Sequence, residues 1–221
     1  MAIVSVVDAA TELGVSERRV RQMLAEGAIV GHRIGRTWAI DTQAIRSADT
    51  QRRQVGRPWS TRSAWAVLAL ADGSEPNLSP VERSRAKKRL AQGLPVIAHR
   101  LSVRAERRTF YAHPGVFDRL AAEPAVVRSG VSAVGDHDVD LIAREDCEVY
   151  VKRSAVDALV DRFRLEERSN RPNVILRVVD EDVWPFIEGQ RVASAVVVAM
   201  DLLDSGDARS MRAGVDLLNR A

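Results

Sequence analysis

The stretch that decides how the chain begins to fold is DAATELGVSERRVRQMLAEGAIVGHRIGRTWAID, residues 8–41. Its apolar residues first recur at helical spacing up to Leu13, and Gly14 then interrupts the pattern. Ser16 is a good N-cap for a second helix, from Glu17 to about Glu26. The pattern therefore predicts two helices joined by a short turn that contains glycine, which is the order of a helix-turn-helix.

The second of these helices has one apolar face and one charged face. Its apolar residues recur three and four positions apart, starting at Val20. Arg18 and Gln22 point away from that face, and Arg19 and Arg21 flank them. Arginine can pair with guanine and glutamine with adenine in the major groove. We expect Arg18, Arg21 and Gln22 to read base edges.

A hairpin is expected directly after the two helices. The segment IVGHRIGRTWAI, residues 29–40, alternates loosely and contains two glycines, a pattern typical of two paired strands. Residues 1–48 thus read as a winged helix-turn-helix domain that binds double-stranded DNA. The residues expected to contact phosphates or the minor groove are Ser16, Arg19, Arg33 and Arg36.

The same stretch resembles the excisionase-type winged helix-turn-helix, a relative of the MerR DNA-binding domain. The resemblance covers about 40 residues and includes Ala-Ala-x-x-Leu-Gly-Val-Ser, then Val-Arg, then Arg-x-Gly-Arg-x-Trp. It implies DNA binding. It does not imply one biological role, since this group includes repressors, activators and excision accessory factors that bend DNA.

Charge is distributed unevenly along the chain. Residues 1–113 contain 19 Lys/Arg and 10 Asp/Glu, a net charge of +9, whereas residues 114–221 contain 14 and 20, a net charge of −6. The excess is densest in residues 52–108, with 13 basic and 4 acidic residues. A basic half joined to an acidic half suggests one module that faces nucleic acid and a second that faces another partner.

Between the two halves we expect a linker and a basic helical segment. Residues 49–58 are polar and lack periodicity, and residues 59–112 contain two expected helices, 60–71 and 79–92, capped by Ser60 and Ser79. The basic residues of the second helix extend the expected DNA footprint: Arg83, Arg85, Lys87, Lys88 and Arg89.

The remaining residues, 113–221, are expected to form an acidic α/β domain. NVILRVV, residues 173–179, is the best strand of the chain, and helices over 193–203 and 208–219 close it as a pair. The expected fold class is therefore α+β. A winged helix-turn-helix at the N-terminus is followed by a mixed α/β C-terminal domain that ends in a helical pair.

One string in this domain suggests catalysis. In SGVSAVGDHDVDLIA, residues 129–143, Asp138 and Asp140 resemble the Asp-x-Asp pair by which minimal nucleotidyltransferases hold Mg²⁺. These enzymes also carry a Gly-Ser dipeptide before the aspartates, and this chain lacks it, because Val131 follows Gly130. A metal-dependent nucleotidyltransferase stays an alternative function, although we expect no enzyme activity, no metal site at His137 and no cofactor.

The C-terminal residues 191–221, RVASAVVVAMDLLDSGDARSMRAGVDLLNRA, and RSGVSA, residues 128–133, resemble actinobacterial AbiEi-like antitoxins of type IV toxin-antitoxin systems. In element order the resemblance covers most of residues 56–221. It implies a two-domain regulator that represses its own operon, with a nucleotidyltransferase-type toxin as partner. The excisionase-like start differs from typical members, which carry another winged module.

Composition bounds the remaining possibilities. The chain has 221 residues, of which 46% are hydrophobic and 29% charged, and a single cysteine, Cys147, so it lacks a disulfide framework. It contains no apolar run of about 18 residues, and we expect that its first residues are not a secretory signal. Acidic neighbours should raise the pKa of the Cys147 thiol. We expect a cytoplasmic, sequence-specific DNA-binding regulator that does not contact a membrane.

Overall fold

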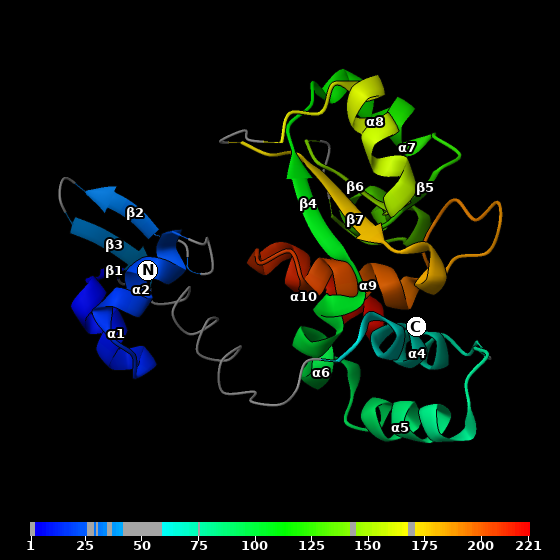
Figure 1. Ribbon diagram of the computed structural model, residues 1–221, viewed down its shortest axis with the longest axis horizontal. Helices are drawn as coiled ribbons and strands as arrows, with labels where there is room; N and C mark the ends of the chain where they lie inside the picture. Colours follow the sequence, from blue (N-terminus) through cyan, green and yellow to red (C-terminus); the bar gives the residue numbers. More distant parts are fainter. Residues whose placement is uncertain are drawn as a thin grey trace. The chain divides into compact units, whose positions relative to one another are not determined.

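The computed structural model describes residues 3–25, 29, 31–34, 37–41, 59–74, 76–141, 145–167 and 171–221. The chain divides into two compact units, Met1–Arg57 and Pro58–Ala221 (Figure 1). The expected linker, residues 49–58, lies outside the described residues. None of the described helices is long and apolar enough to cross a membrane.

The described residues of the first unit include two helices and a small antiparallel sheet. Helices α1 (Val6–Leu13) and α2 (Glu17–Ala25) are followed by strands β2 (Gly31–Ile34) and β3 (Thr37–Asp41), and β1 (Ile3–Val4) pairs with the other edge of β3. The two expected helices and the two expected strands, which pair antiparallel, are therefore present in this order in the described residues.

Local capping fixes the ends of α1. Ser5 and Asp8 form a capping box at its start, and Gly14 ends it with φ 62° and ψ 39°, a left-handed conformation that favours glycine. The Gly14 N–H donates to the carbonyls of Ala10 and Thr11. The chain can therefore turn sharply into α2 without losing the hydrogen bonds of the last helical turn.

The second unit is built on a four-stranded mixed sheet. Its strand order is β4 (Glu106–Phe110), β7 (Val174–Val179), β6 (Cys147–Lys152) and β5 (Val126–Arg128), with β6 and β7 parallel and the other pairs antiparallel. The expected strand over 173–179 is confirmed as β7. It lies in the middle of the sheet, which explains its nearly continuous apolar sequence.

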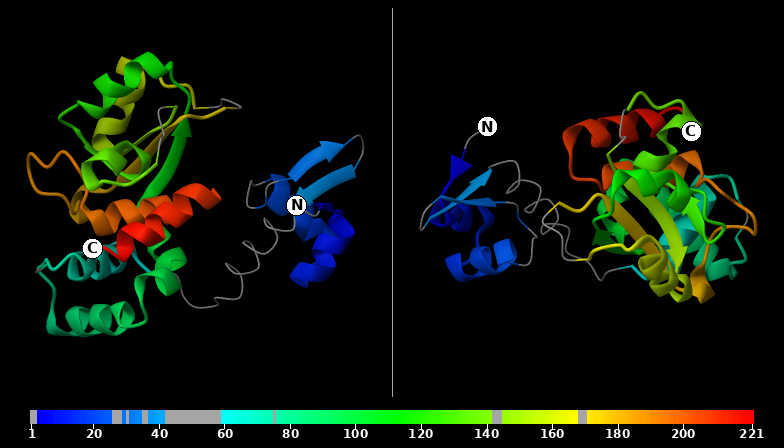
Figure 2. Two further views of the ribbon diagram at one scale, coloured as in Figure 1. Left: turned by 180° about the vertical axis from the view of Figure 1, so that it is seen from behind. Right: turned by 90° about the horizontal axis from the view of Figure 1, so that it is seen from above.

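Helices cover both faces of this sheet (Figure 1). One apolar cluster joins α7 (Phe117–Ala121) and α8 (Val156–Phe163) to one face. A larger cluster on the other face includes residues of α4 (Thr61–Ala71), α6 (Leu94–Leu101) and α9 (Ala195–Leu203). Helix α5 (Pro80–Leu90) packs beside α4, and α10 (Ala208–Leu218) beside α9 (Figure 2). The mixed α+β class is confirmed for this unit.

The basic segment and the acidic domain belong to one unit. The sequence separates residues 59–112 from 113–221, but β4 of the first segment forms the edge of the sheet that holds β5, β6 and β7. β4 was not expected, because its sequence Glu-Arg-Arg-Thr-Phe carries charges on an edge strand whose first residues are exposed. The boundary between units falls at residue 57 instead.

Candidate nucleic-acid interface

Helix α2 separates its core residues from its basic residues. The core residues Val20, Met23 and Leu24 are buried among α1 and the small sheet. A Cβ at Gly31 would lie 2.8 Å from Leu24 Cδ2 and 3.2 Å from the Ala39 carbonyl oxygen, so a side chain there would displace the Leu24 side chain and crowd β3. This close packing fixes which side of α2 faces solvent.

The three expected base-reading residues lie on the solvent side of α2. Arg18, Arg21 and Gln22 are all exposed. The Arg21 guanidinium donates to the Glu17 carboxylate one turn earlier at 2.5 Å, and both side chains are about half exposed. An exposed pair of this kind contributes little stability, so Arg21 can exchange Glu17 for another acceptor at low cost.

Two of the expected phosphate contacts lie at the start of α2. The Ser16 hydroxyl accepts from the Arg19 backbone N–H at 3.3 Å, and the Ser16 carbonyl accepts from the N–H groups of Arg19 and Val20. Ser16 is therefore confirmed as the cap of α2, and its side chain remains exposed, as does that of Arg19. Arg33 belongs to β2, where its Cα pairs with that of Trp38, and Arg36 lies outside the described residues.

The five basic residues of helix α5 differ in their exposure and in what they contact. Arg85 and Arg89 line a cavity between α5 and α4. Arg83 is half-buried and donates to the Pro76 carbonyl at 3.5 Å, whereas Lys87 and Lys88 are exposed away from that cavity. The five basic residues of α5 thus do not form one continuous DNA-facing surface, because only Arg85 and Arg89 line the same cavity.

The Asp-x-Asp pair does not lie on a strand. The 3-10 segment from Gly130 to His137 ends at Asp138, which has a left-handed backbone with φ 52°. Asp138 and Asp140 are both exposed and follow this segment in irregular structure, not on the strand that the nucleotidyltransferase motif uses. The His137 imidazole contacts the Ala193 carbonyl at 2.9 Å. Within the described ranges, no three His, Cys, Asp or Glu side chains gather as a metal site.

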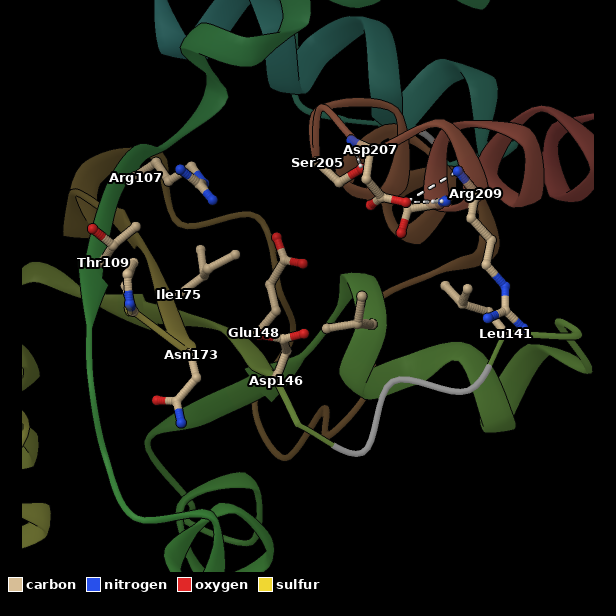
Figure 3. A pocket seen from close by; sticks show the side chains of 13 residues that line it. Arg107, Thr109, Leu141, Asp146, Glu148, Asn173, Ile175, Ser205, Asp207 and Arg209 are labelled. Atoms are coloured by element: carbon tan, nitrogen blue, oxygen red, sulfur yellow. Dashed lines mark hydrogen bonds between the residues drawn. The ribbon is translucent and has the colours of Figure 1, made fainter. Parts of the chain in front are cut away.

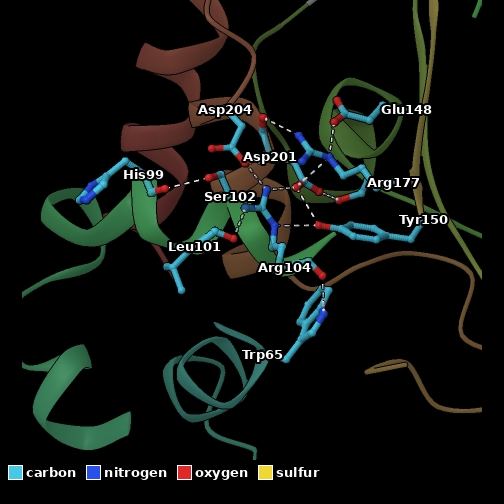
Figure 4. A network of polar contacts seen from close by, with 11 residues as sticks. Trp65, His99, Leu101, Ser102, Arg104, Glu148, Tyr150, Arg177, Asp201 and Asp204 are labelled. Atoms are coloured by element: carbon cyan, nitrogen blue, oxygen red, sulfur yellow. Dashed lines mark hydrogen bonds and ion pairs between the residues drawn. The ribbon is translucent and has the colours of Figure 1, made fainter. Parts of the chain in front are cut away.

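A buried network of charged side chains joins α9 to the sheet (Figure 4). Asp201 of α9 accepts from Arg104 and from the Tyr150 hydroxyl at 2.8 Å, and Arg177 lies 3.0 Å from the same carboxylate. Arg177 also donates to Glu148 at 2.6 Å. All five side chains are at most 2% exposed. Burial raises the pKa of Glu148, and Arg177 opposes that shift.

Sequence reasoning missed this network. Arg104 is one of the 13 basic residues of the segment 52–108, yet it is fully buried. Its partner Asp201 lies 97 positions away, inside a helix that otherwise reads as apolar. The one available signal was that single aspartate in the run Ala-Val-Val-Val-Ala-Met-Asp-Leu-Leu, because a charge amid apolar residues is buried only with a partner.

A cavity of about 340 Å³ opens beside this network, between the sheet and the first turn of α10 (Figure 3). Arg107 and Glu148 point into it from the sheet, and Asp207 and Arg209 line it from the start of α10. Glu148 is already bound to Arg177, and Asp207 accepts from the Arg209 N–H at 3.0 Å as the cap of α10. Both carboxylates therefore have structural partners.

The cysteine lies in the apolar cluster between the sheet and helices α7 and α8, on the other face of the sheet from the cavity. Cys147 is 1% exposed at the start of β6. Burial raises the pKa of its thiol to about 11, and the nearby carboxylates of Glu148, Asp118 and Asp146 add to the shift. The expected direction is confirmed, but burial and not the acidic neighbours is the main cause. A thiol of this kind is a structural residue.

Comparison with known protein families, with curated proteins and with solved structures finds no match for this chain.

Proposed function

We propose that the first unit is a winged helix-turn-helix that binds duplex DNA, with α2 as its recognition helix and the β2–β3 pair as its wing. The observation that supports this most directly is the exposed face formed by Arg18, Arg21 and Gln22, opposite the buried face of α2. In a helix-turn-helix, the second helix lies in the major groove, and its exposed N-terminal residues contact base edges.

The chemistry of this face suits base edges and phosphates together. A guanidinium can donate two hydrogen bonds to guanine O6 and N7, and a glutamine amide can pair with adenine N6 and N7. Ser16 and Arg19 lie at the start of the same helix, where side chains and backbone N–H groups meet phosphate oxygens. Arg33 and Arg36 are proposed to contact DNA from the hairpin.

We propose further that the protein is a transcriptional regulator that represses its own operon as an antitoxin. The support for this step is the resemblance of residues 191–221 to AbiEi-like antitoxins; these residues include α9 and α10. The partner would be a nucleotidyltransferase-type toxin encoded beside it. Co-expression with the adjacent reading frame tests this: relief of growth arrest supports the antitoxin role, and arrest that persists contradicts it.

The DNA-binding proposal is tested by a gel shift on the DNA upstream of the gene. We expect one discrete complex that resists scrambled competitor and weakens as salt rises, with a slope of about 0.9 per phosphate neutralised. Binding no tighter than to scrambled DNA would contradict a sequence-specific regulator. A ladder of complexes with strong bending would instead favour an accessory protein of recombination.

A further inference from the structure

The cavity between α4 and α5 gathers cations from two helices. It measures about 150 Å³ and is lined by Arg62 of α4 and by Arg85 and Arg89 of α5, with the hydroxyls of Ser60 and Ser63 beside them. Pockets for drug-sized ligands measure about 300–1,000 Å³, so this one suits a single small group. Figure 1 shows α4 and α5 lying side by side.

Among the described residues that line this cavity, Glu82 is the one acid, and its carboxylate already has partners. Its carboxylate accepts from the Ser79 backbone N–H at 2.9 Å and from the Ser79 hydroxyl at 2.7 Å, which completes the capping box of α5. It also lies 3.4 Å from Arg62, and both side chains are well exposed. Over the part of the chain that the structure describes, Arg85 and Arg89 form no ion pair with a carboxylate.

Folding holds these cations together despite their repulsion. The pKa of Arg89 is lowered, first by burial and then by the charges of Arg85 and Arg100. The Arg89 guanidinium lies over the ring of Trp59, 4.4 Å from its centroid, and Arg100 lies 5.8 Å from the same centroid. The buried indole therefore orients Arg89 before any ligand arrives.

We propose that this cavity is a phosphate-binding site, with Arg85 and Arg89 as its principal ligand contacts and Arg62 at its rim. Arginine binds phosphate through two parallel N–H donors, and a doubly charged anion relieves the repulsion within the cluster. The site lies in the second unit, so it does not depend on the DNA-binding role of the first. The phosphate belongs either to a nucleic-acid backbone or to a small phosphate compound.

The first arm of the test titrates inorganic phosphate into the full chain by calorimetry, with chloride holding the ionic strength constant. Arg85→Gln and Arg89→Gln are each expected to weaken phosphate binding by about tenfold or more, since each removes a charge-assisted contact. Arg85 is exposed, so its variant should fold even if Arg89→Gln does not. Arg212→Gln, on the exposed side of α10, is the matched control and should bind as the unchanged chain does.

The second arm identifies the source of the phosphate. A scrambled DNA duplex is titrated over a salt series with the same three variants. A salt slope that falls by about 0.9 in Arg85→Gln, and not in the control, assigns the site to a nucleic-acid backbone. An unchanged slope, with phosphate binding lost in the first arm, assigns it to a small phosphate compound. The proposal is overturned if Arg85→Gln changes neither phosphate binding nor the slope.

Discussion

Asp201 is the acceptor that several buried side chains of the second unit share. Its carboxylate faces Arg104 and Arg177 and accepts from the hydroxyls of Tyr150 and Ser129, all in a region closed to solvent. A buried ion pair contributes little net stability while it is intact, but removing one partner leaves an uncompensated charge in a poor solvent. Asp201 is therefore costly to lose.

Asp201→Ala is expected to lower the free energy of unfolding by about 3–5 kcal/mol, because two buried guanidinium groups lose their shared acceptor. Urea denaturation followed by circular dichroism measures this. Asp216→Ala, at an exposed position of α10, serves as the matched control and should change stability by less than about 0.5 kcal/mol. A loss below about 1 kcal/mol in Asp201→Ala would contradict the role given to the network.

Cys147 provides a second prediction at this scale. Because its pKa is raised to about 11, we expect the native protein at pH 8 to react with a thiol reagent far more slowly than the protein in urea. As pH rises above the ordinary value of 9.0, the unfolded thiol loses its proton first, so stability should fall between about pH 9 and 11. Equal labelling rates with and without urea would show that the thiol is not enclosed.

Helices were predicted well where the cap and the apolar residues that signal them lie within a few residues of each other. The Ser60 and Ser79 caps hold as expected, and the closing helical pair is present as α9 and α10. β4 was not predicted, because an edge strand with charged residues has no period of its own, and α6 was not predicted, because it is short and has no side-chain cap. The buried network could not be predicted, since its side chains come from distant parts of the chain, with Arg104 and Asp201 97 positions apart (Figure 4).

The contact between α9 and α10 depends on Gly214. A Cβ there would lie 2.7 Å from the Ala199 carbonyl oxygen and 3.1 Å from Leu202 Cβ. Alanine normally favours a helix over glycine by about 1 kcal/mol, but overpacking costs about 1–3 kcal/mol, so the clash should decide the sign.

Gly214→Ala is therefore expected to destabilise the protein, by about 1 kcal/mol, in thermal and urea unfolding. Val215→Ala, at the neighbouring exposed position, is the control and should change stability by less than about 0.5 kcal/mol. A Gly214→Ala protein more stable than the unchanged chain would mean that the two helices are free to separate.

For the whole molecule, the unit boundary changes how the charge is interpreted. Residues 1–57 carry 9 basic and 6 acidic side chains, a net charge of +3, whereas residues 58–221 carry 24 of each. The second unit is thus neutral overall and not acidic, although α5 itself carries five basic residues and one acidic residue. The split into a basic and an acidic half, although correct as a count, does not coincide with the folded units.

The proposed reading of DNA sequence by α2 is tested by competition binding of the upstream DNA against scrambled DNA. We compare the unchanged chain with Arg18→Ala and with Arg212→Ala, which removes the same charge from the exposed side of α10. Arg18→Ala is expected to lose about 1–3 kcal/mol of the preference for the upstream DNA, whereas Arg212→Ala is expected to keep it. An unchanged preference in Arg18→Ala would contradict the claim.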